Sequence, residues 1–399
     1  MTTMKAMVYY GANDIRFEDR PVPTILHPGD AIIKLEKVTI CGTDLGIWKG
    51  KNPEIEQETT RKEGSFNGRI LGHEGIGIME EVGSAVQNFK KGDRVIISCV
   101  SRCGTCENCQ KQLYAHCRNE GGWIMGYMID GTHAEYVRTP FADTSLYHLP
   151  EGLNQDVAVF LSDILPTSHE IGVQYGDVKP GDNVAIVGAG PIGMSCLLTA
   201  QFYSPANIIM VDMDDNRLEF AKTVGATHTI NSAKEDAIQK ILEITDGRGV
   251  DCAIEAVGVE PTWNICQHVV KEGGHIANVG VHGKPVSFEL NKLWIKNLGG
   301  VSKSMLALNK SVIKVKESQI KGFKMIFELF RKVATSPKST PDSMTNSTIV
   351  TFNTDGKKLT DHLLATLKCC DKTIPMITRN SSILNPKLFK SSFKTLNRC

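Results

Sequence analysis

The sequence predicts a two-domain α/β protein, with a mostly β domain over residues 1–154, a doubly wound parallel α/β domain over 155–297 and an atypical segment over 298–399. Three observations support this division. The chain has 399 residues, 41% of them hydrophobic, which is enough for two cores. Short β-branched runs dominate the first part, and strand-like runs alternate with helix-length stretches in the second. Charge and glycine content both change near residue 300.

Strand-like runs define the first two parts of the chain. Runs such as DAIIKLEKV, GIGIMEEVG and DRVIISCV are separated by Gly, Pro and Asp, which favour turns, so we expect a compact β-rich domain. The later runs NVAIVGAG, NIIMVDMD, CAIEAVGV and HIANVGV alternate with stretches of helical length. This alternation is typical of a parallel sheet with crossover helices.

The last hundred residues have a different composition. Residues 301–399 carry 18 Lys and Arg but 6 Asp and Glu, although the whole chain has a net charge of +1. We expect a solvated, partly disordered basic segment, with one amphipathic helix at about 310–333. The alternatives are that this helix lies on an anionic membrane or docks on the protein body. No recognition motif accompanies the charge, so we predict no nucleic-acid partner.

The N-terminus lacks the apolar region and cleavage site of a signal peptide, and no run of about 18 apolar residues occurs. We therefore expect a cytoplasmic protein that is not embedded in a membrane. Because the cytosol keeps thiols reduced, the twelve cysteines are predicted to be thiols and metal ligands.

A glycine motif opens the second domain directly after the run NVAIV. Glycines at this spacing allow a tight turn, a close approach to a pyrophosphate and close helix packing. The next strand ends in Asp212, whose carboxylate would bind the ribose hydroxyls and repel a 2′-phosphate, so NAD is predicted over NADP. A tight turn in a nucleotide-free sheet is the alternative. The predicted cofactor-binding residues of this region are Gly188, Gly190, Pro191, Ile192, Gly193, Asp212 and Arg217.

Four cysteines in SRCGTCENCQKQLYAHC have the spacing of a tetrahedral zinc site, with ligands Cys103, Cys106, Cys109 and Cys117. Four thiolates leave no open coordination position, so this zinc would hold a loop and take no part in chemistry. A reduced cysteine-rich loop and an iron–sulfur site are the alternatives. Cys99 falls outside the spacing and is expected to be an ordinary buried thiol.

Two further stretches contain what an open metal site needs. TICGTDLG supplies Cys41 with a hydroxyl at Thr43, and RILGHEGIG supplies His73 and Glu74. Taken alone, Cys41 could be a core thiol and His73 a hydrogen-bonded histidine. Their occurrence in this order with the cysteine loop and the glycine motif favours a metal centre.

The chain at this point resembles the zinc-dependent medium-chain alcohol dehydrogenases over about residues 4–297. The matching motifs are C-G-T-D, G-H-E-G, the four-cysteine loop, L-S-D-I-L-P-T, the glycine motif and ANVGVHG. The resemblance implies a GroES-like catalytic domain, a Rossmann domain and an active site in the cleft between them. It implies a catalytic zinc on Cys41, His73 and Asp163, with Glu74 beside it as an occasional ligand, and hence two zinc ions per chain with the cysteine loop.

The same resemblance assigns roles around the zinc. Thr43 would receive the proton of the alcohol, Asp44 would orient His73, and Trp123 would line the substrate pocket, although a core tryptophan is the alternative. Backbone near Val279 and Val281 would hold the nicotinamide. A homo-oligomer is usual in the family, but the residues that set it fall in the divergent segment.

Two departures from the family pattern stand out. Gly46 replaces a histidine that ends a proton path in many relatives, so we expect altered pH dependence with activity retained. After Asn297 the chain no longer follows the family, and we hypothesise that its native ending was replaced, for example through a different frame or exon.

These features predict a zinc-dependent oxidoreductase that transfers hydride between NAD and a small primary or secondary alcohol, with an aldehyde or ketone in reverse. A polyol or amino-alcohol dehydrogenase is one alternative. A non-catalytic protein that binds zinc and NAD, or a misfolded product caused by the altered ending, is another.

Overall fold

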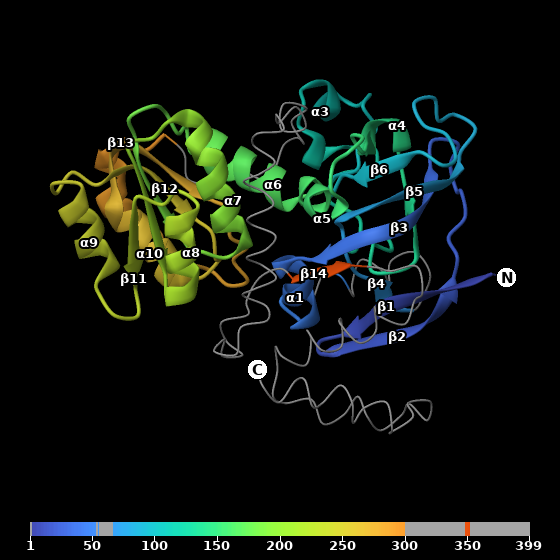
Figure 1. The fold of residues 1–399 in the computed structure, drawn as a ribbon, viewed down its shortest axis with the longest axis horizontal. Coiled ribbons are helices and arrows are strands. Elements are labelled where there is room, and N and C mark those ends of the chain that lie inside the picture. The colour runs from blue at the N-terminus through green and yellow to red at the C-terminus, as the bar shows by residue number, and fades with distance from the viewer. Residues whose placement is uncertain (1, 53–54, 56–66, 300–347, 352–399) are drawn as a thin grey trace.

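The computed structural model describes residues 2–52, 55, 67–299 and 348–351. Two domains lie side by side, a β-rich domain and a parallel α/β domain, with short helices of the connecting segment between them (Figure 1). The predicted architecture is therefore confirmed.

The β-rich domain contains two sheets. The three-stranded sheet has the order β2 (Asp14–Pro21), β1 (Thr3–Gly11) and β4 (Arg69–Ile70). The larger sheet has the order β14 (Thr348–Thr351), β3 (Ala31–Ile40), β5 (Gly75–Val82), β6 (Arg94–Ile97) and β8 (Leu146–His148), with β7 (Tyr136–Thr139) also on β3. The short helices of the domain are α1 (Gly42–Trp48), α3 (Glu107–Gln110), the 3₁₀ turn η1 (Tyr114–His116) and α4 (Ala142–Ser145).

A series of short helical turns connects the domains. They are α5 (Gln155–Ala158), η2 (Val159–Leu161), α6 (Ile164–Thr167) and the π-helix η3 (Ser168–Gln174). Buried apolar side chains of this segment pack on Ile76 of β5 and Ile96 of β6, and Ile192 and Leu198 from the second domain join the same cluster. The connecting segment therefore belongs to a core shared by both domains.

The second domain has a five-stranded parallel sheet, as the alternating pattern predicts. Its order is β11 (His228–Asn231), β10 (Asn207–Asp212), β9 (Asn183–Val187), β12 (Val250–Glu255) and β13 (Val270–Asn278). Its helices are α7 (Pro191–Ala200), η4 (Gln201–Tyr203), α8 (Asp215–Thr223), α9 (Ala237–Ile244), α10 (Glu260–Val269), α11 (Leu290–Leu293) and η5 (Trp294–Lys296). Two apolar clusters cover the two faces of the sheet. From β9 the next strands, β10 and β11, are added on one side, and β12 and β13 are added on the other. The strand order therefore switches between β9 and β12, where α/β proteins commonly bind ligands.

Of residues 298–399, the structure describes 298–299 and β14. The backbone of β14 pairs antiparallel with residues 37–40 of β3, beyond the stretch 31–34 that pairs with β7. No strand was expected in this segment, so β14 is a finding of the structure. The helix expected at about 310–333 lies outside the described residues. Within the described ranges, no helix has the length and apolar composition needed to cross a bilayer.

Candidate metal centre and cofactor site

The first candidate metal ligand, Cys41, follows directly on β3 and precedes the first turn of α1. Its backbone N–H donates to the Asp44 carboxylate over 2.8 Å, so the side chain of Asp44 turns back onto the start of the helix. The Thr43 hydroxyl lies 3.7 Å from the Cys41 sulfur. One tight turn therefore supplies a thiol, a hydroxyl and a buried carboxylate.

His73 enters the site from the loop between β4 and β5. Its Nδ1 lies 3.4 Å from Asp44 Oδ1, an oxygen that also accepts a hydrogen bond from the Gly72 backbone at 3.2 Å. The other oxygen of Asp44 lies 3.8 Å from His133 Nε2. Asp44 thus lies against the ring nitrogen that points away from Asp163, the arrangement that fixes a histidine ligand in orientation and tautomer.

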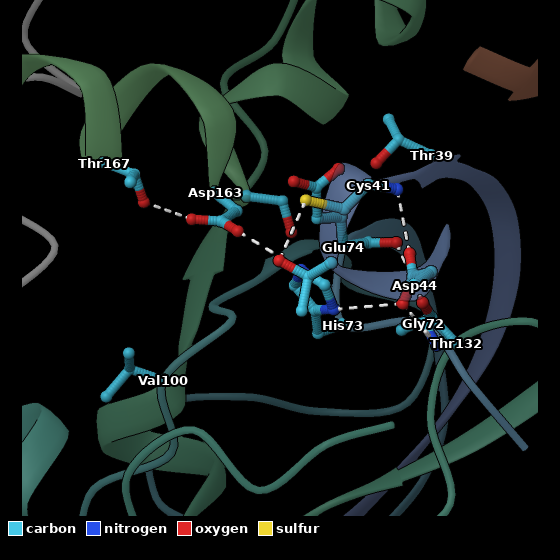
Figure 2. A network of polar contacts seen from close by, with 12 residues as sticks. Thr39, Cys41, Asp44, Gly72, His73, Glu74, Val100, Thr132, Asp163 and Thr167 are labelled. Carbon is cyan, nitrogen blue, oxygen red and sulfur yellow. Dashed lines mark hydrogen bonds and ion pairs between the residues drawn. The ribbon is translucent and has the colours of Figure 1, made fainter. Parts of the chain in front are cut away.

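The remaining two groups come from different parts of the chain. Glu74 follows His73, whereas Asp163 lies in the connecting segment at the start of α6. Asp163 Oδ2 approaches His73 Nε2 to 3.3 Å. One ligand atom from each of Cys41, His73, Glu74 and Asp163 lies within 4.8 Å of the others (Figure 2).

The electrostatics of this group fit a bound cation. Both carboxylate oxygens of Glu74 are buried and have no hydrogen-bond partner among the described residues. Burial and the nearby charges of Cys41 and Asp163 raise the pKa of Glu74 well above its usual value. Burial opposes protonation of His73, but Asp44 and Asp163 outweigh it and hold the pKa of the imidazole well above its usual value. Mixed sulfur, nitrogen and oxygen donors that share a buried negative site are ligands that suit zinc.

Trp123 borders this centre. Its ring meets that of His73 edge-on with 6.0 Å between centroids and stacks on Tyr127 at 4.6 Å. Gly46 lies one turn after Thr43 on α1, and a β-carbon there would have Asn52 as its nearest neighbour, at 3.7 Å. Among the described residues, the second turn of α1 therefore has room for a side chain at this position.

The second metal group consists of the four predicted cysteines. One sulfur from each of Cys103, Cys106, Cys109 and Cys117 lies within 4.8 Å of the others. Backbone N–H groups point at the sulfurs, including those of Cys106 to Cys103 at 3.3 Å and of Cys109 to Cys106 at 3.4 Å. All four are free thiols in the structure.

The ionisation of these thiols favours a metal. Burial opposes ionisation of Cys103, but hydrogen bonds from Thr105 and from the Cys106 backbone lower the pKa of its thiol to about 6. Burial raises the pKa of Cys109 to about 12. At neutral pH its thiolate therefore needs a neighbouring cation to stabilise it. Backbone hydrogen bonds to thiolates and a shared cation are features of cysteine zinc sites.

The glycine motif forms the turn between β9 and α7. Gly188 has a φ of +109°, and a β-carbon at Gly193 would lie 1.7 Å from the Gly188 carbonyl oxygen, so both positions require glycine. The Ala189 backbone N–H donates to Asp212 over 2.6 Å, and Arg217 lies 3.8 Å from the same carboxylate. Pro191 and Ile192 begin α7, so the predicted residues of this turn converge on one edge of the sheet.

Val279 and Val281 follow β13 and lie at the same edge. The backbone N–H of Val279 donates to the carbonyl of Glu255 over 2.8 Å, and Val281 is 66% exposed, with its backbone against Gly258. Glu255, which the sequence analysis did not single out, is fully buried at the end of β12 and accepts the N–H groups of the following turn. The Glu255 carboxylate thus fixes the turn at 257–258, and its backbone carbonyl holds the chain at Val279 and Gly280.

Sequence reasoning missed two contacts of Asp163. The Thr167 hydroxyl donates to Asp163 Oδ1. Cys99 is buried as expected, but its thiol also forms a hydrogen bond with Asp163 and is therefore part of the centre's surroundings. Thr167 is four residues after Asp163 on a helix, a spacing that brings side chains together and could have indicated the first contact.

Comparisons with known proteins agree with this architecture. The family model described as the alcohol dehydrogenase GroES-like domain matches residues 27–151, and the zinc-binding dehydrogenase model matches residues 191–316. An alcohol dehydrogenase of Cupriavidus necator is 34% identical over 303 residues, which cover 72% of this chain and 79% of that protein. A D-xylulose reductase A of Aspergillus niger is 32% identical over 297 residues, covering 73% and 80%.

Solved structures show the same likeness. The apo form of zinc dependent alcohol dehydrogenase 2 from Streptococcus pneumonia is 49% identical, covers 83% of this chain and 95% of its own, and has a TM-score of 0.72. Alcohol dehydrogenase TADH from Thermus sp. ATN1 is 29% identical, with coverages of 82% and 97% and a TM-score of 0.72. The two-domain fold, the zinc-ligand groups and these matches show that the chain belongs to the zinc-dependent medium-chain alcohol dehydrogenase family, whose members bind a nicotinamide dinucleotide.

Proposed function

We propose that the protein is an NAD-dependent zinc alcohol dehydrogenase that oxidises small primary or secondary alcohols to aldehydes or ketones. The observation that carries this proposal is the convergence of Cys41, His73 and Asp163, with one ligand atom of each within 4.8 Å of the others. Three protein ligands and an open position are typical of catalytic zinc. A zinc ion held there supplies Lewis acidity that lowers the pKa of an alcohol.

The surrounding side chains have distinct roles in this proposal. The hydroxyl of Thr43, 3.7 Å from the Cys41 sulfur, receives the proton of the alcohol. Asp44 keeps His73 in one orientation, Glu74 provides a further carboxylate beside the metal, and Trp123 forms a wall of the substrate pocket. Because Gly46 provides no side chain to continue the proton path, the proton leaves through water.

NAD is the proposed hydride acceptor, bound at the edge of the parallel sheet. The backbone of the turn after β9 lies against the pyrophosphate of NAD. The Asp212 carboxylate accepts hydrogen bonds from the ribose hydroxyls, and Arg217 lies beside it. Backbone around Val279 and Val281 holds the nicotinamide. The four cysteines bind a second zinc, so the proposed content is two zinc ions per chain.

A substrate panel tests the proposal. The purified full chain, supplied with zinc, is mixed with NAD and with ethanol, 2-propanol, 2,3-butanediol, sorbitol or threonine, and NADH is followed by absorbance. Turnover of a small alcohol that a chelator abolishes is the expected result. Preference for sorbitol would support a polyol dehydrogenase, which the similarity to a D-xylulose reductase favours as second candidate. Soluble protein with two zinc ions and bound NAD but no turnover would support a non-catalytic role.

Replacing Asp212 by asparagine is expected to shift cofactor preference toward NADP. Asparagine keeps an oxygen for the Ala189 N–H and loses the charge that repels a 2′-phosphate, but its NH2 group cannot accept the N–H groups of Met213 and Asp214. Removing one like-charge contact of about 1–3 kcal/mol corresponds to a change of roughly 5-fold to 150-fold in the ratio of kcat/KM values for the two cofactors. Steady-state kinetics with NAD and NADP measure that ratio.

Asp214→Asn is the matched control, because Asp214 caps α8 through the Asn216 N–H and asparagine is an equally good cap. It should leave the ratio unchanged. An unchanged ratio in Asp212→Asn would contradict the role of Asp212 in excluding NADP.

A further inference from the structure

The two oxygens of the Asp163 carboxylate have different neighbours. Oδ2 faces His73 Nε2 at 3.3 Å, whereas Oδ1 accepts a hydrogen bond from the Thr167 hydroxyl (Figure 2). The carboxylate therefore points one oxygen toward the candidate ligands and the other away from them. The Asp163 side chain is 14% exposed and its contact with Thr167 is partly buried, so the hydrogen bond at Oδ1 is partly shielded from competing water.

The backbone that carries Asp163 is fixed from the adjacent position. The Ser162 hydroxyl accepts the N–H of Gly75 at 2.9 Å and donates to the carbonyl of Ile97, and the Ser162 carbonyl accepts the Cys99 N–H at 3.2 Å. These bonds tie the connecting segment to the start of β5 and the end of β6. With the backbone held, rotation of the carboxylate is the main freedom left to Asp163, and the Cys99 thiol and the Thr167 hydroxyl both contact that carboxylate.

Thr167 is placed to remove that freedom. Its N–H bonds to the Asp163 carbonyl at 2.9 Å, so one helical turn joins the two residues and sets the hydroxyl beside the carboxylate. Threonine is branched at Cβ and has few accessible rotamers in a helix, which lowers the entropic cost of this contact. The Thr167 hydroxyl thereby holds Asp163 Oδ1, which leaves Oδ2 directed at His73.

We propose that Thr167 is a positioning residue that holds Asp163 as a one-oxygen metal ligand and so keeps a coordination position open for substrate. A carboxylate free to rotate can present both oxygens to a metal, which fills an additional position. The hydrogen bond at Oδ1 opposes this binding mode. The inference rests on the proposed function insofar as it assigns a metal to this centre, but it concerns metal binding and not turnover.

Thr167→Val and Thr167→Ser test the proposal, because valine has the shape of threonine without its hydroxyl and serine keeps the hydroxyl. Thr199→Val is the matched control: Thr199 is also buried on a helix, and its hydroxyl bonds to the carbonyl of Ser195 at 2.8 Å, in α7. Each full-length protein is loaded with zinc, and release of zinc to a chromogenic chelator is timed. The visible spectrum of the protein loaded with Co²⁺ reports the coordination number of the metal.

In Thr167→Val, one zinc equivalent is expected to leave about 10-fold faster, since loss of a hydrogen bond to a ligand typically costs 10–100-fold in metal affinity. Its Co²⁺ bands should weaken as the coordination number rises. Thr167→Ser and Thr199→Val should match the unaltered protein in both measurements. Normal zinc release and normal Co²⁺ bands in Thr167→Val would overturn the proposal. Both readouts are independent of alcohol turnover, so failure of the proposed enzymatic function is detected separately by the substrate panel.

Discussion

Replacing His73 by alanine is expected to remove one zinc ion per chain and to lower kcat/KM for alcohol oxidation by at least about 10³-fold. The side chain is 2% exposed and its two ring nitrogens face Asp44 and Asp163, so no solvent-accessible group can replace it. Without it, Cys41, Glu74 and Asp163 are left with one donor fewer to hold a cation. Metal analysis and steady-state kinetics with NAD measure the two effects.

His148→Ala is the control for a histidine outside the centre. His148 lies on β8, where its ring packs against Phe89 at a centroid distance of 4.6 Å and bonds to the Asn88 carbonyl. This variant should keep both zinc ions and its turnover. Full zinc content with unaltered kcat/KM in His73→Ala would show that the metal, or the chemistry, is located elsewhere.

Substitution of Cys106 by serine is expected to empty the cysteine site and to lower the Tm by about 5–10 °C. The reason is the small apolar core of this loop: within α3 only Cys109 is buried, and η1 has no buried residue. The loop therefore depends on its sulfur contacts for order, and structural zinc supplies folding free energy directly. Zinc content, thermal unfolding and the rate of proteolysis within 103–117 are the measurements.

Cys196→Ser separates loss of metal from loss of a thiol. Cys196 is fully buried in α7 and donates to the Ser168 carbonyl at 3.5 Å, and it belongs to neither ligand group. The variant should retain both zinc ions even if its Tm falls. Two zinc ions in Cys106→Ser, or an unchanged rate of loop proteolysis, would contradict a structural zinc at the four cysteines.

Features encoded by neighbouring residues were predictable from the sequence. The two-residue spacing of Cys103, Cys106 and Cys109 brings three sulfurs together within one turn, and a short loop returns Cys117 to them. Gly188 and Gly193 mark a turn that no larger residue can form. The alternation of strands and helices likewise predicted the parallel sheet. In each case the physical constraint lies within a few bonds of the residues that reveal it.

Features created by tertiary contact were not predictable in the same way. Asp163 could be assigned only through the family resemblance, because its approach to His73 depends on how the connecting segment packs between two sheets. The contact of Cys99 with Asp163 and the buried carboxylate of Glu255 have the same origin. β14 is β-branched throughout, which favours a strand, but its pairing with β3 forms through backbone hydrogen bonds that residue type does not specify.

The position of β14 also bears on how the chain folds during synthesis. Residues 37–40 emerge early from the ribosome, but the strand that pairs with them lies roughly 300 residues later. At about 5–20 residues per second, that interval is roughly 15 s to a minute. Until then, the end of β3 next to Cys41 presents unpaired backbone groups to chaperones and to other nascent chains. The domain that is translated first is thus the last to be completed.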